Sequence, residues 1–365
     1  MTPREATIAL NMLPKIGPIR VRRLLEHLES ADNILTASIS QLTKVQGIGP
    51  ETARNIVSWE DSVDLSAELA EAQSRGLHII TQDESDYPEA LRHMYDPPLA
   101  LYIWGKLTPA DKHAIAVVGS RKTTHYGQSA AHSLSKDLAR TGLTIISGLA
   151  RGIDTCAHKG AIEAGGRTIA VLGSGLGQLY PPENMKLAEQ IADGNGAVIS
   201  EFSLSHAPDK KTFPMRNRIV AAWSSGILVC ECPRWSGSII TANLGMEMGK
   251  TIYAVPGQID RPTSAGCNQL IRDGATLVSS ADDILEDLEA LPLNFGLEIQ
   301  PESTPPVELD ATEQKVLDTL SKEESLIDHI LVKSGLTVPV VITTLLKLEM
   351  KRLVRQLPGP RYMLR

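Results

Sequence analysis

Runs of apolar and β-branched residues alternate with amphipathic stretches through the middle of this 365-residue chain. Such short apolar runs, separated by helical segments, are typical of a parallel sheet that helices cover on both faces. Several of the runs end in Gly or Ser, at the carboxyl edge where open α/β sheets bind ligands. We predict strands at Leu77–Gln82, Ala114–Ser120, Leu143–Gly148, Thr168–Gly175, Ala197–Phe202, Gly226–Cys232, Thr251–Gly257 and Ala275–Ser280.

The pattern changes on either side of this region, so we predict four zones. Residues 1–60 indicate short helices separated by Gly-Pro turns, and residues 61–290 hold the sheet. Residues 291–309 are rich in proline, which predicts an extended linker. Residues 310–365 return to helices.

The last zone has the pattern of a winged helix, with three helices followed by a hairpin. Asp310 and Glu313 have the spacing of a capping box at the first helix, and Gly359 is predicted to turn the hairpin. Its charge is nearly balanced, so either DNA or a protein could be its partner. The candidates for a basic face are Lys347, Lys351, Arg352, Arg355 and Arg361.

Two N-terminal segments, Leu13–Leu25 and Leu42–Ile56, share an apolar lead-in, a Gly-containing turn and a helix. The second predicts a helix-hairpin-helix, in which Gly47 and Gly49 let the amides of a helix start approach a phosphate. Such hairpins hold the DNA backbone without reading its sequence. Few basic residues flank the two glycines, so a packing or protein-contact role fits equally well.

Charge and cysteine content narrow the function classes. The net charge is −7, which argues against a nucleic-acid grip spread over the whole surface, so any DNA contact must use local basic patches. We find neither a signal-peptide pattern nor a long apolar run, and therefore expect no membrane partner. The four cysteines lack metal-ligand spacing, and we expect free thiols in a cytoplasmic protein.

One local basic patch stands out between Asp209 and Arg218, where four basic residues face one acidic residue and give a local charge of +3. Cations interleaved with an aromatic side chain make a platform for unstacked bases and their phosphates. The competing interpretation places the aromatic ring in the core and the two arginines in internal ion pairs. The patch consists of Lys210, Lys211, Phe213, Arg216 and Arg218.

The turns after two predicted strands carry further candidates. Ser120 and Arg121 follow one strand, so the cation points at whatever the sheet edge binds, and Gly148 ends the next strand. Asp154 and His158 follow shortly after, and we predict helix capping and internal hydrogen bonding for them rather than catalysis.

A helix start at Ser236, Gly237 and Ser238 offers backbone amides to an anion. Neither glycine-containing turn of the central region has the G-x-G-x-x-G spacing followed by a helix, so we predict no nucleotide cofactor. We also predict no metal.

Taken together, these strings closely resemble the DprA/Smf family of DNA-processing proteins of bacterial natural transformation. The matching strings include IAVVGSR, SGLARGIDTCAH, YPPEN, FPMRNR, SGSIITA and SAGCNQLIRDGA, in the family's order, over about Tyr87–Ala275. Two positions depart from the pattern: Cys232 stands where a small residue such as alanine is expected, and the segment Glu349–Arg352 lacks the usual glycine.

The resemblance implies an α/β fold, with an extended Rossmann-like core between a helix-hairpin-helix domain and a winged-helix domain. It also implies a homodimer that binds single-stranded DNA without sequence preference and helps to load a RecA-type recombinase. The implied pocket includes Arg121, Lys210 or Lys211, and Phe213, with Arg216 and Asn217 nearby.

Two other functions stay open. The same broad Rossmann-like group is similar to nucleotide-cleaving phosphoribohydrolases, which use a P-G-G-x-G-T helix start and a nearby glutamate. Here the corresponding stretch is SGSIITA, so that signature is missing. The third alternative is a scaffold whose terminal domains dock proteins while the pocket is vestigial.

Overall fold

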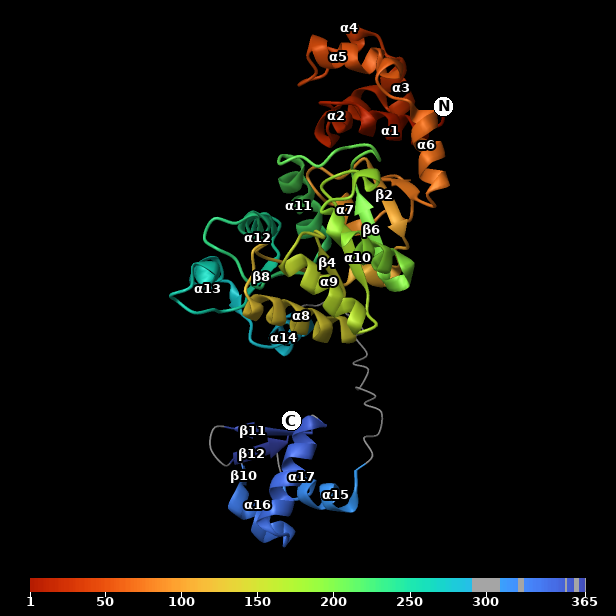
Figure 1. The fold of residues 1–365 in the computed structure, drawn as a ribbon. Helices are drawn as coiled ribbons and strands as arrows, with labels where there is room; N and C mark the ends of the chain where they lie inside the picture. The colour runs from red at the N-terminus through yellow and green to blue at the C-terminus, as the bar shows by residue number, and fades with distance from the viewer. Residues whose placement is uncertain (291–308, 321–324, 352, 358–360, 365) are drawn as a thin grey trace. The chain divides into compact units, whose positions relative to one another are not determined.

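The computed structural model describes residues 1–290, 309–320, 325–351, 353–357 and 361–364. The chain divides into two compact units, Met1–Ile299 and Gln300–Arg365 (Figure 1). Apart from Leu309, the predicted linker at 291–309 lies outside the described residues.

The described strands of the first unit form one nine-stranded sheet in the order β1-β2-β6-β5-β4-β3-β7-β8-β9. Every run predicted as a strand contains one, and β3 to β9 are parallel to their neighbours within this set, as predicted. The strands are β1 (His78–Thr81), β2 (Ala100–Gly105), β3 (Ala114–Val118), β4 (Thr144–Ser147), β5 (Thr168–Val171), β6 (Gly196–Ser200), β7 (Gly226–Val229), β8 (Thr251–Ala254) and β9 (Thr276–Leu277).

Two features of the sheet differ from the prediction. Strand β2 was not predicted, and it pairs antiparallel with both β1 and β6, so the sheet is mixed at this end. The predicted strands also extend too far at their carboxyl ends, because the chain leaves the sheet before the last residues of each run and builds turns there.

Side chains that alternate along the strands divide the core into two layers. On β3, Ala114, Ala116 and Val118 face one layer, and Ile115 and Val117 face the other. The first layer is covered by α7 (Glu89–Arg92), α11 (Thr212–Trp223), α12 (Gly237–Glu247) and α13 (Ala265–Arg272). The second is covered by α8 (His125–Arg140), α9 (Ile153–Glu163) and α14 (Asp282–Ala290).

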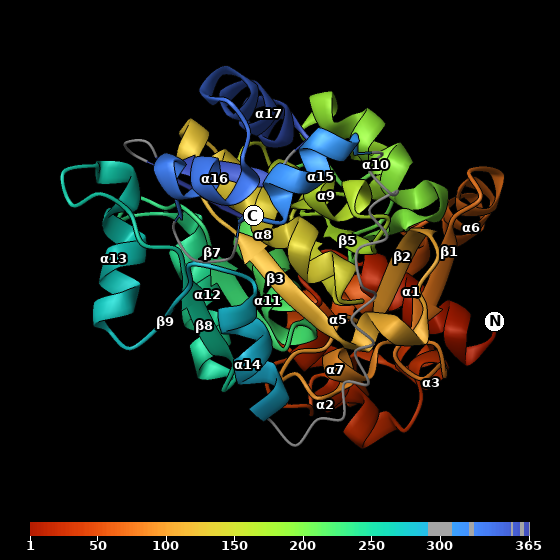
Figure 2. The ribbon, with the colours of Figure 1, turned by 90° about the horizontal axis from the view of Figure 1, so that it is seen from below.

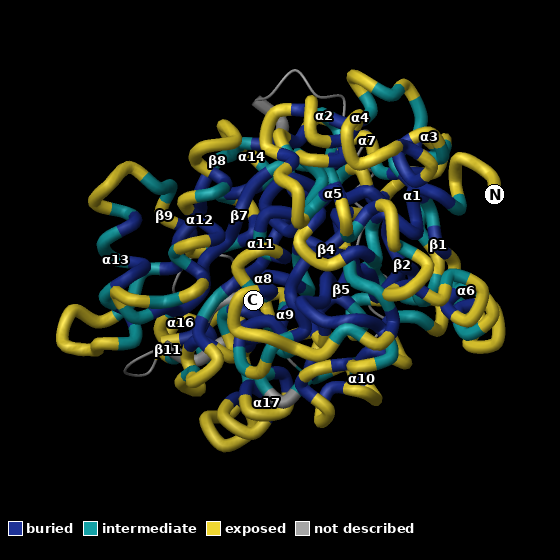
Figure 3. Tube along the Cα trace, turned by 90° about the horizontal axis from the view of Figure 1, so that it is seen from above, coloured by how far each residue is buried: buried dark blue, intermediate teal, exposed yellow. Residues whose placement is uncertain are grey.

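Figure 2 shows α8 and α9 beside β3 and β5. The central strands are buried, whereas the outer turns of the helices are exposed (Figure 3).

The N-terminal helices have their own core and also pack on the sheet. Ile48, in the predicted hairpin, is buried in that core, whereas Ile8 packs with Tyr102 of β2. The Asn11 amide also donates to the Glu201 carbonyl oxygen at 2.9 Å. The helices are α1 (Pro3–Met12), α2 (Pro18–Leu28), α3 (Ala31–Thr36), α4 (Ile39–Leu42) and α5 (Pro50–Val57), and α6 (Leu65–Ser74) and α10 (Met185–Gln190) complete the unit.

The second unit has the winged-helix elements predicted for it. Helices α15 (Ala311–Leu317), α16 (Ile327–Ser334) and α17 (Val338–Met350) accompany strands β10 (Ser325–Leu326), β11 (Val354–Leu357) and β12 (Arg361–Leu364). The capping box is present, since the Asp310 carboxylate accepts from the amide of Glu313 at 2.8 Å and Glu313 caps the Asp310 amide in return. The predicted turn at Gly359 lies outside the described residues.

No single helix among the described residues is long and apolar enough to cross a membrane. Two successive helices are together long and apolar enough, but the chain bends by 109° between them; they are Ile327–Ser334 and Val338–Glu349.

Candidate nucleic-acid interface

The strand order places the candidate site at the carboxyl edge of the sheet. The chain builds β3, β4, β5 and β6 in one direction and then returns to place β7 on the other side of β3. In open α/β sheets a ligand crevice forms at such a reversal. Ser120 follows β3, Gly148 follows β4, Gly173 lies beyond β5, and Glu231 lies beyond β7.

The turn that carries Arg121 is held by Glu231. The Ser120 amide donates to the Glu231 carbonyl oxygen at 2.6 Å. The Glu231 carboxylate accepts from the Thr123 hydroxyl at 2.6 Å and from the Thr124 amide at 2.8 Å. Burial opposes ionisation of Glu231, but these hydrogen bonds outweigh it and hold its pKa below the usual range. The carboxylate therefore fixes the turn, and the Arg121 side chain is exposed.

Arg121 lies over the ring of Phe213, with its guanidinium carbon 4.9 Å from the ring centroid. Phe213 is half-buried, and its ring rests on the backbone of Gly173, where an added Cβ would come within 2.8 Å of Cδ1. The ring of Tyr180 stands 5.9 Å from that of Phe213 at 51°. These three side chains form an exposed cation–aromatic cluster at the sheet edge.

Tyr180 was missed by the sequence analysis. It lies in the YPPEN string, which carries the family resemblance and is the sequence signal that could have found it.

Arg216 lies beneath this surface and is buried, with 4% of its area exposed. Its guanidinium donates to the carbonyl oxygen of Val171, and its Nε donates to the Asn217 side chain at 3.2 Å. Burial lowers its pKa to about 10, partly offset by the Asp154 carboxylate, so it remains a cation at neutral pH. Asp154 also accepts from the amides of Gly148 and Ala150, which matches the internal role predicted for it.

Arg218 is bound internally instead of facing the edge. Its guanidinium is bidentate to Glu201, at 3.1 and 2.7 Å, and its Nε donates to Asp96 at 2.9 Å. The structure therefore agrees with the interpretation that puts Arg218 in ion pairs, and this guanidinium has little capacity left for a phosphate.

The remaining central candidates are exposed or lie at helix starts. Lys210 and Lys211 are exposed just before α11, and within the described residues neither ammonium forms an ion pair. The Asn217 amide reaches the Gly237 carbonyl oxygen at 3.5 Å, which joins α11 to the start of α12. Ser236 is the N-cap of α12, since its hydroxyl accepts from the Ser238 amide at 3.3 Å.

Two sets of candidates belong to other elements. Gly47 and Gly49 lie in the turn before α5; Gly47 has a φ of 89°, a left-handed conformation that favours glycine. In the second unit, Lys351 pairs with Glu313 at 2.6 Å and Lys347 approaches Asp310 at 4.0 Å. Arg352 lies outside the described residues, as does the side chain of Arg355, whereas Arg361 is exposed.

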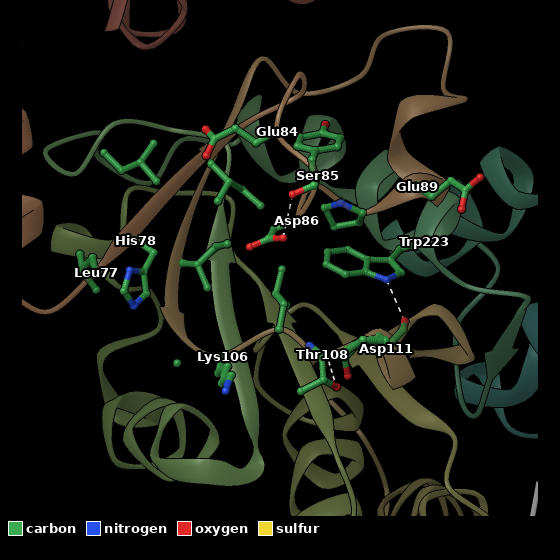
Figure 4. A pocket seen from close by; sticks show the side chains of 18 of the residues that line it. Leu77, His78, Glu84, Ser85, Asp86, Glu89, Lys106, Thr108, Asp111 and Trp223 are labelled. Atoms are coloured by element: carbon green, nitrogen blue, oxygen red, sulfur yellow. Dashed lines mark hydrogen bonds between the residues drawn. The ribbon is translucent and has the colours of Figure 1, made fainter. Parts of the chain in front are cut away.

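A hollow of about 1240 Å³ in the first unit lies at the opposite edge of the sheet (Figure 4). Its lining includes Lys106 at the end of β2, which runs antiparallel to β6, and Asp111, which precedes β3. None of the predicted DNA-contact residues lines it.

Comparisons with known proteins match the whole architecture. A model of the family described as DNA recombination-mediator protein A matches residues 78–289, a DprA winged helix domain matches 300–360, and a SAM-like helix-hairpin-helix tandem matches 8–58. Protein Smf from Synechocystis sp. is 33% identical over 387 residues, which cover 97% of each chain.

Two solved structures are also similar. That of DNA processing protein A from Streptococcus pneumoniae has a TM-score of 0.67 and 33% identity, and covers 79% of this chain and 98% of that one. That of DNA processing protein A from Helicobacter pylori concerns its single-stranded DNA binding mode. It has a TM-score of 0.53 and 29% identity, and covers 59% of this chain and 98% of that one.

Arg218→Met should lower the free energy of unfolding by about 3–5 kcal/mol, because it leaves the buried Glu201 carboxylate without a counter-charge. Urea denaturation measures this change. In the double variant Arg218→Met, Glu201→Gln the uncompensated charge is removed, so part of the loss should be recovered. A single variant within about 1 kcal/mol of the parent would contradict the structural role.

Gly148→Ala should destabilise the protein by about 1–3 kcal/mol, because an added Cβ would lie 2.1 Å from the buried Nη1 of Arg216. The matched control is Gly237→Ala, where nothing lies within 4 Å of the added Cβ, so its stability should change by less than about 1 kcal/mol. Thermal denaturation compares the two variants, and equal effects would argue against the close approach at Gly148.

Proposed function

This chain belongs to the DNA recombination-mediator protein A family, the DprA/Smf proteins, and we propose that it binds single-stranded DNA without sequence preference at the carboxyl edge of its sheet. One observation carries the proposal: the exposed Arg121 and the half-buried Phe213 form a cation–aromatic pair beside two lysines that, among the residues the structure describes, form no ion pair. Every base has a face that can stack on an aromatic ring, so such a site tolerates any sequence.

Each candidate residue has a separate task in this proposal. Phe213 and Tyr180 offer ring faces to unstacked bases. Arg121, Lys210 and Lys211 neutralise phosphates, and the start of α12 at Ser236–Ser238 binds another phosphate, to which the Gly237 amide donates. Arg216, which is buried, helps to fix the register of α11, the helix that carries Phe213, and does not touch DNA.

We extend the proposal to the wider role that the resemblance implies. The protein acts as a homodimer in the cytoplasm, protects incoming single strands in natural transformation, and helps to load a RecA-type recombinase onto them. The family description, recombination mediator, supports this role. The H. pylori relative, whose structure concerns single-stranded DNA binding, supports the choice of ligand.

The alternative, a phosphoribohydrolase-like enzyme, is disfavoured by the state of the ionisable groups near the site. Asp154 is buried and already accepts two backbone hydrogen bonds. His158 is buried and hydrogen-bonded to Thr168, and burial lowers its pKa to about 3. Both groups are thus committed to internal contacts. Incubation with nucleoside monophosphates should release no free base, and release of base would favour the enzyme.

Phe213→Ala should weaken binding of a labelled oligo-dT by roughly 5- to 150-fold, which is the ~1–3 kcal/mol expected for one lost stacking contact. The double variant Lys210→Ala, Lys211→Ala should weaken binding to all sequences alike. It should also reduce the slope of log affinity against log salt by about 1.4 if each lysine neutralises one phosphate. Fluorescence anisotropy at several salt concentrations measures both effects.

Lys112→Ala is the matched control, because Lys112 is an exposed lysine at the opposite edge of the sheet. Its affinity and salt slope should equal those of the parent protein. A matched duplex should compete weakly with the single strand. If the parent protein fails to bind oligo-dT, or if the Phe213 and lysine variants bind like Lys112→Ala, the proposed interface is wrong.

A further inference from the structure

The loop between β7 and α12 exposes a tryptophan that lies outside the Arg121–Phe213 cluster. Trp235 has 92% of its surface exposed, whereas Trp223 in the core has 3%. Arg234 beside it is also exposed. An indole held in water forgoes most of the stabilisation that burial of so large an apolar ring provides. Both faces of this indole are therefore accessible to a ligand that could stack on it.

Both ends of this loop are fixed. At its start, the Cys232 carbonyl oxygen accepts from the amide of Gly266 in α13 at 2.9 Å. At its end, Ser236 caps α12. The tip at Arg234 and Trp235 therefore projects from a held base, so little ordering entropy would be lost when a ligand binds there.

The loop adjoins the proposed single-strand path. The Asn217 side chain donates to the Gly237 carbonyl oxygen at 3.5 Å, two residues after Trp235. Asn217 lies one helical turn after Phe213 on α11. These connections put the backbone of Trp235 within about 20 Å of that of Phe213, a distance that an extended strand of a few nucleotides covers.

The chemistry of the loop favours nucleic acid over a protein as its occupant. Arg234 and Trp235 place an exposed cation and an exposed ring next to each other in the chain, the two side-chain types that meet at Arg121 and Phe213. The positive end of α12 follows directly. The nearest carboxylate in the sequence, Glu231, is already engaged by Thr123 and Thr124 and adds no accessible negative charge.

We propose that Trp235 is a second stacking platform, assisted by Arg234, which extends the path of the single strand from Phe213 across Asn217 to the start of α12. This inference rests on the proposed function of the Arg121–Phe213 cluster. In this arrangement the DNA strand is held by two separated stacks, with exposed cations at the Phe213 end and Arg234 at the Trp235 end.

Trp235→Ala is tested with oligo-dT of increasing length, from about 4 to 16 nucleotides. Its binding should equal that of the parent for the shortest oligomers, which reach one platform, and fall about tenfold for oligomers long enough to span both. Trp235→Phe keeps a ring and should retain most of the affinity. A strand with abasic sites in place of the spanning bases should show no difference between parent and Trp235→Ala. Because the side chain is exposed, the thermal denaturation midpoint should be unchanged.

Intrinsic fluorescence gives an independent readout, because a base stacked on an indole quenches it. Oligo-dT should quench the parent, and most of this quenching should be lost in Trp235→Phe, which keeps the tryptophans at 59, 104 and 223.

If Phe213→Ala weakens binding of oligo-dT but Trp235→Ala does not at any length of the oligomer, this inference is wrong and the proposed function stands. If the parent binds no single strand, the proposed function fails first. A loss of dimer in sedimentation of Trp235→Ala, with unchanged quenching, would assign the ring to a protein contact and overturn the inference.

Discussion

Two guanidinium groups buried on one helix, α11, hold the candidate interface in place. A charge removed from water costs several kcal/mol unless it is paired and hydrogen-bonded. Arg218 finds Glu201 and Asp96, and Arg216 finds the Val171 carbonyl oxygen beside Asp154. Since these partners come from separate parts of the fold, a shift of α11 along its axis would leave both guanidinium groups without their partners. The helix register, and with it Phe213, is fixed by this requirement.

The same constraint explains two glycines at the sheet edge. With the register set, the first turns of α11 run against the ends of β4 and β5. A Cβ at Gly148 would meet Arg216, and one at Gly173 would meet Phe213. The absence of side chains there lets Phe213 lie flat on backbone, with its ring turned toward Arg121. These two positions require glycine because a neighbouring side chain of α11 approaches the backbone closely, and neither residue has a positive φ.

Local pattern was enough to predict the parallel strands, because each is a short apolar run bounded by small residues. It was not enough for β2, whose LYIW run follows two prolines and pairs antiparallel with segments elsewhere in the chain, because that pairing is not local.

Composition was enough to find the basic patch, but it did not show which of its cations are buried and which are exposed. Arg216 and Arg218 lie about 200° apart around the helix, so a single buried face would cover only one. Both are buried because α11 is covered by the sheet on one side and by α7 and α12 on another. The Tyr180 contact depends on a loop path that sequence spacing does not encode.

The buried arginines also change what the charge pattern means for binding. Two of the four cations in the patch are compensated or enclosed within the protein, so the exposed excess at this edge comes from Lys210, Lys211 and Arg121. A protein of net charge −7 with so few exposed cations at the site cannot rely on counterion release alone. In the proposed function, ring stacking must then supply a large share of the affinity for DNA. This term depends little on salt and not on base identity, and it requires the strand to be unpaired. The proposed preference for single-stranded over duplex DNA would follow from the same geometry, because a ring that rests on the sheet edge can reach the face of a base only where the base has left its stack.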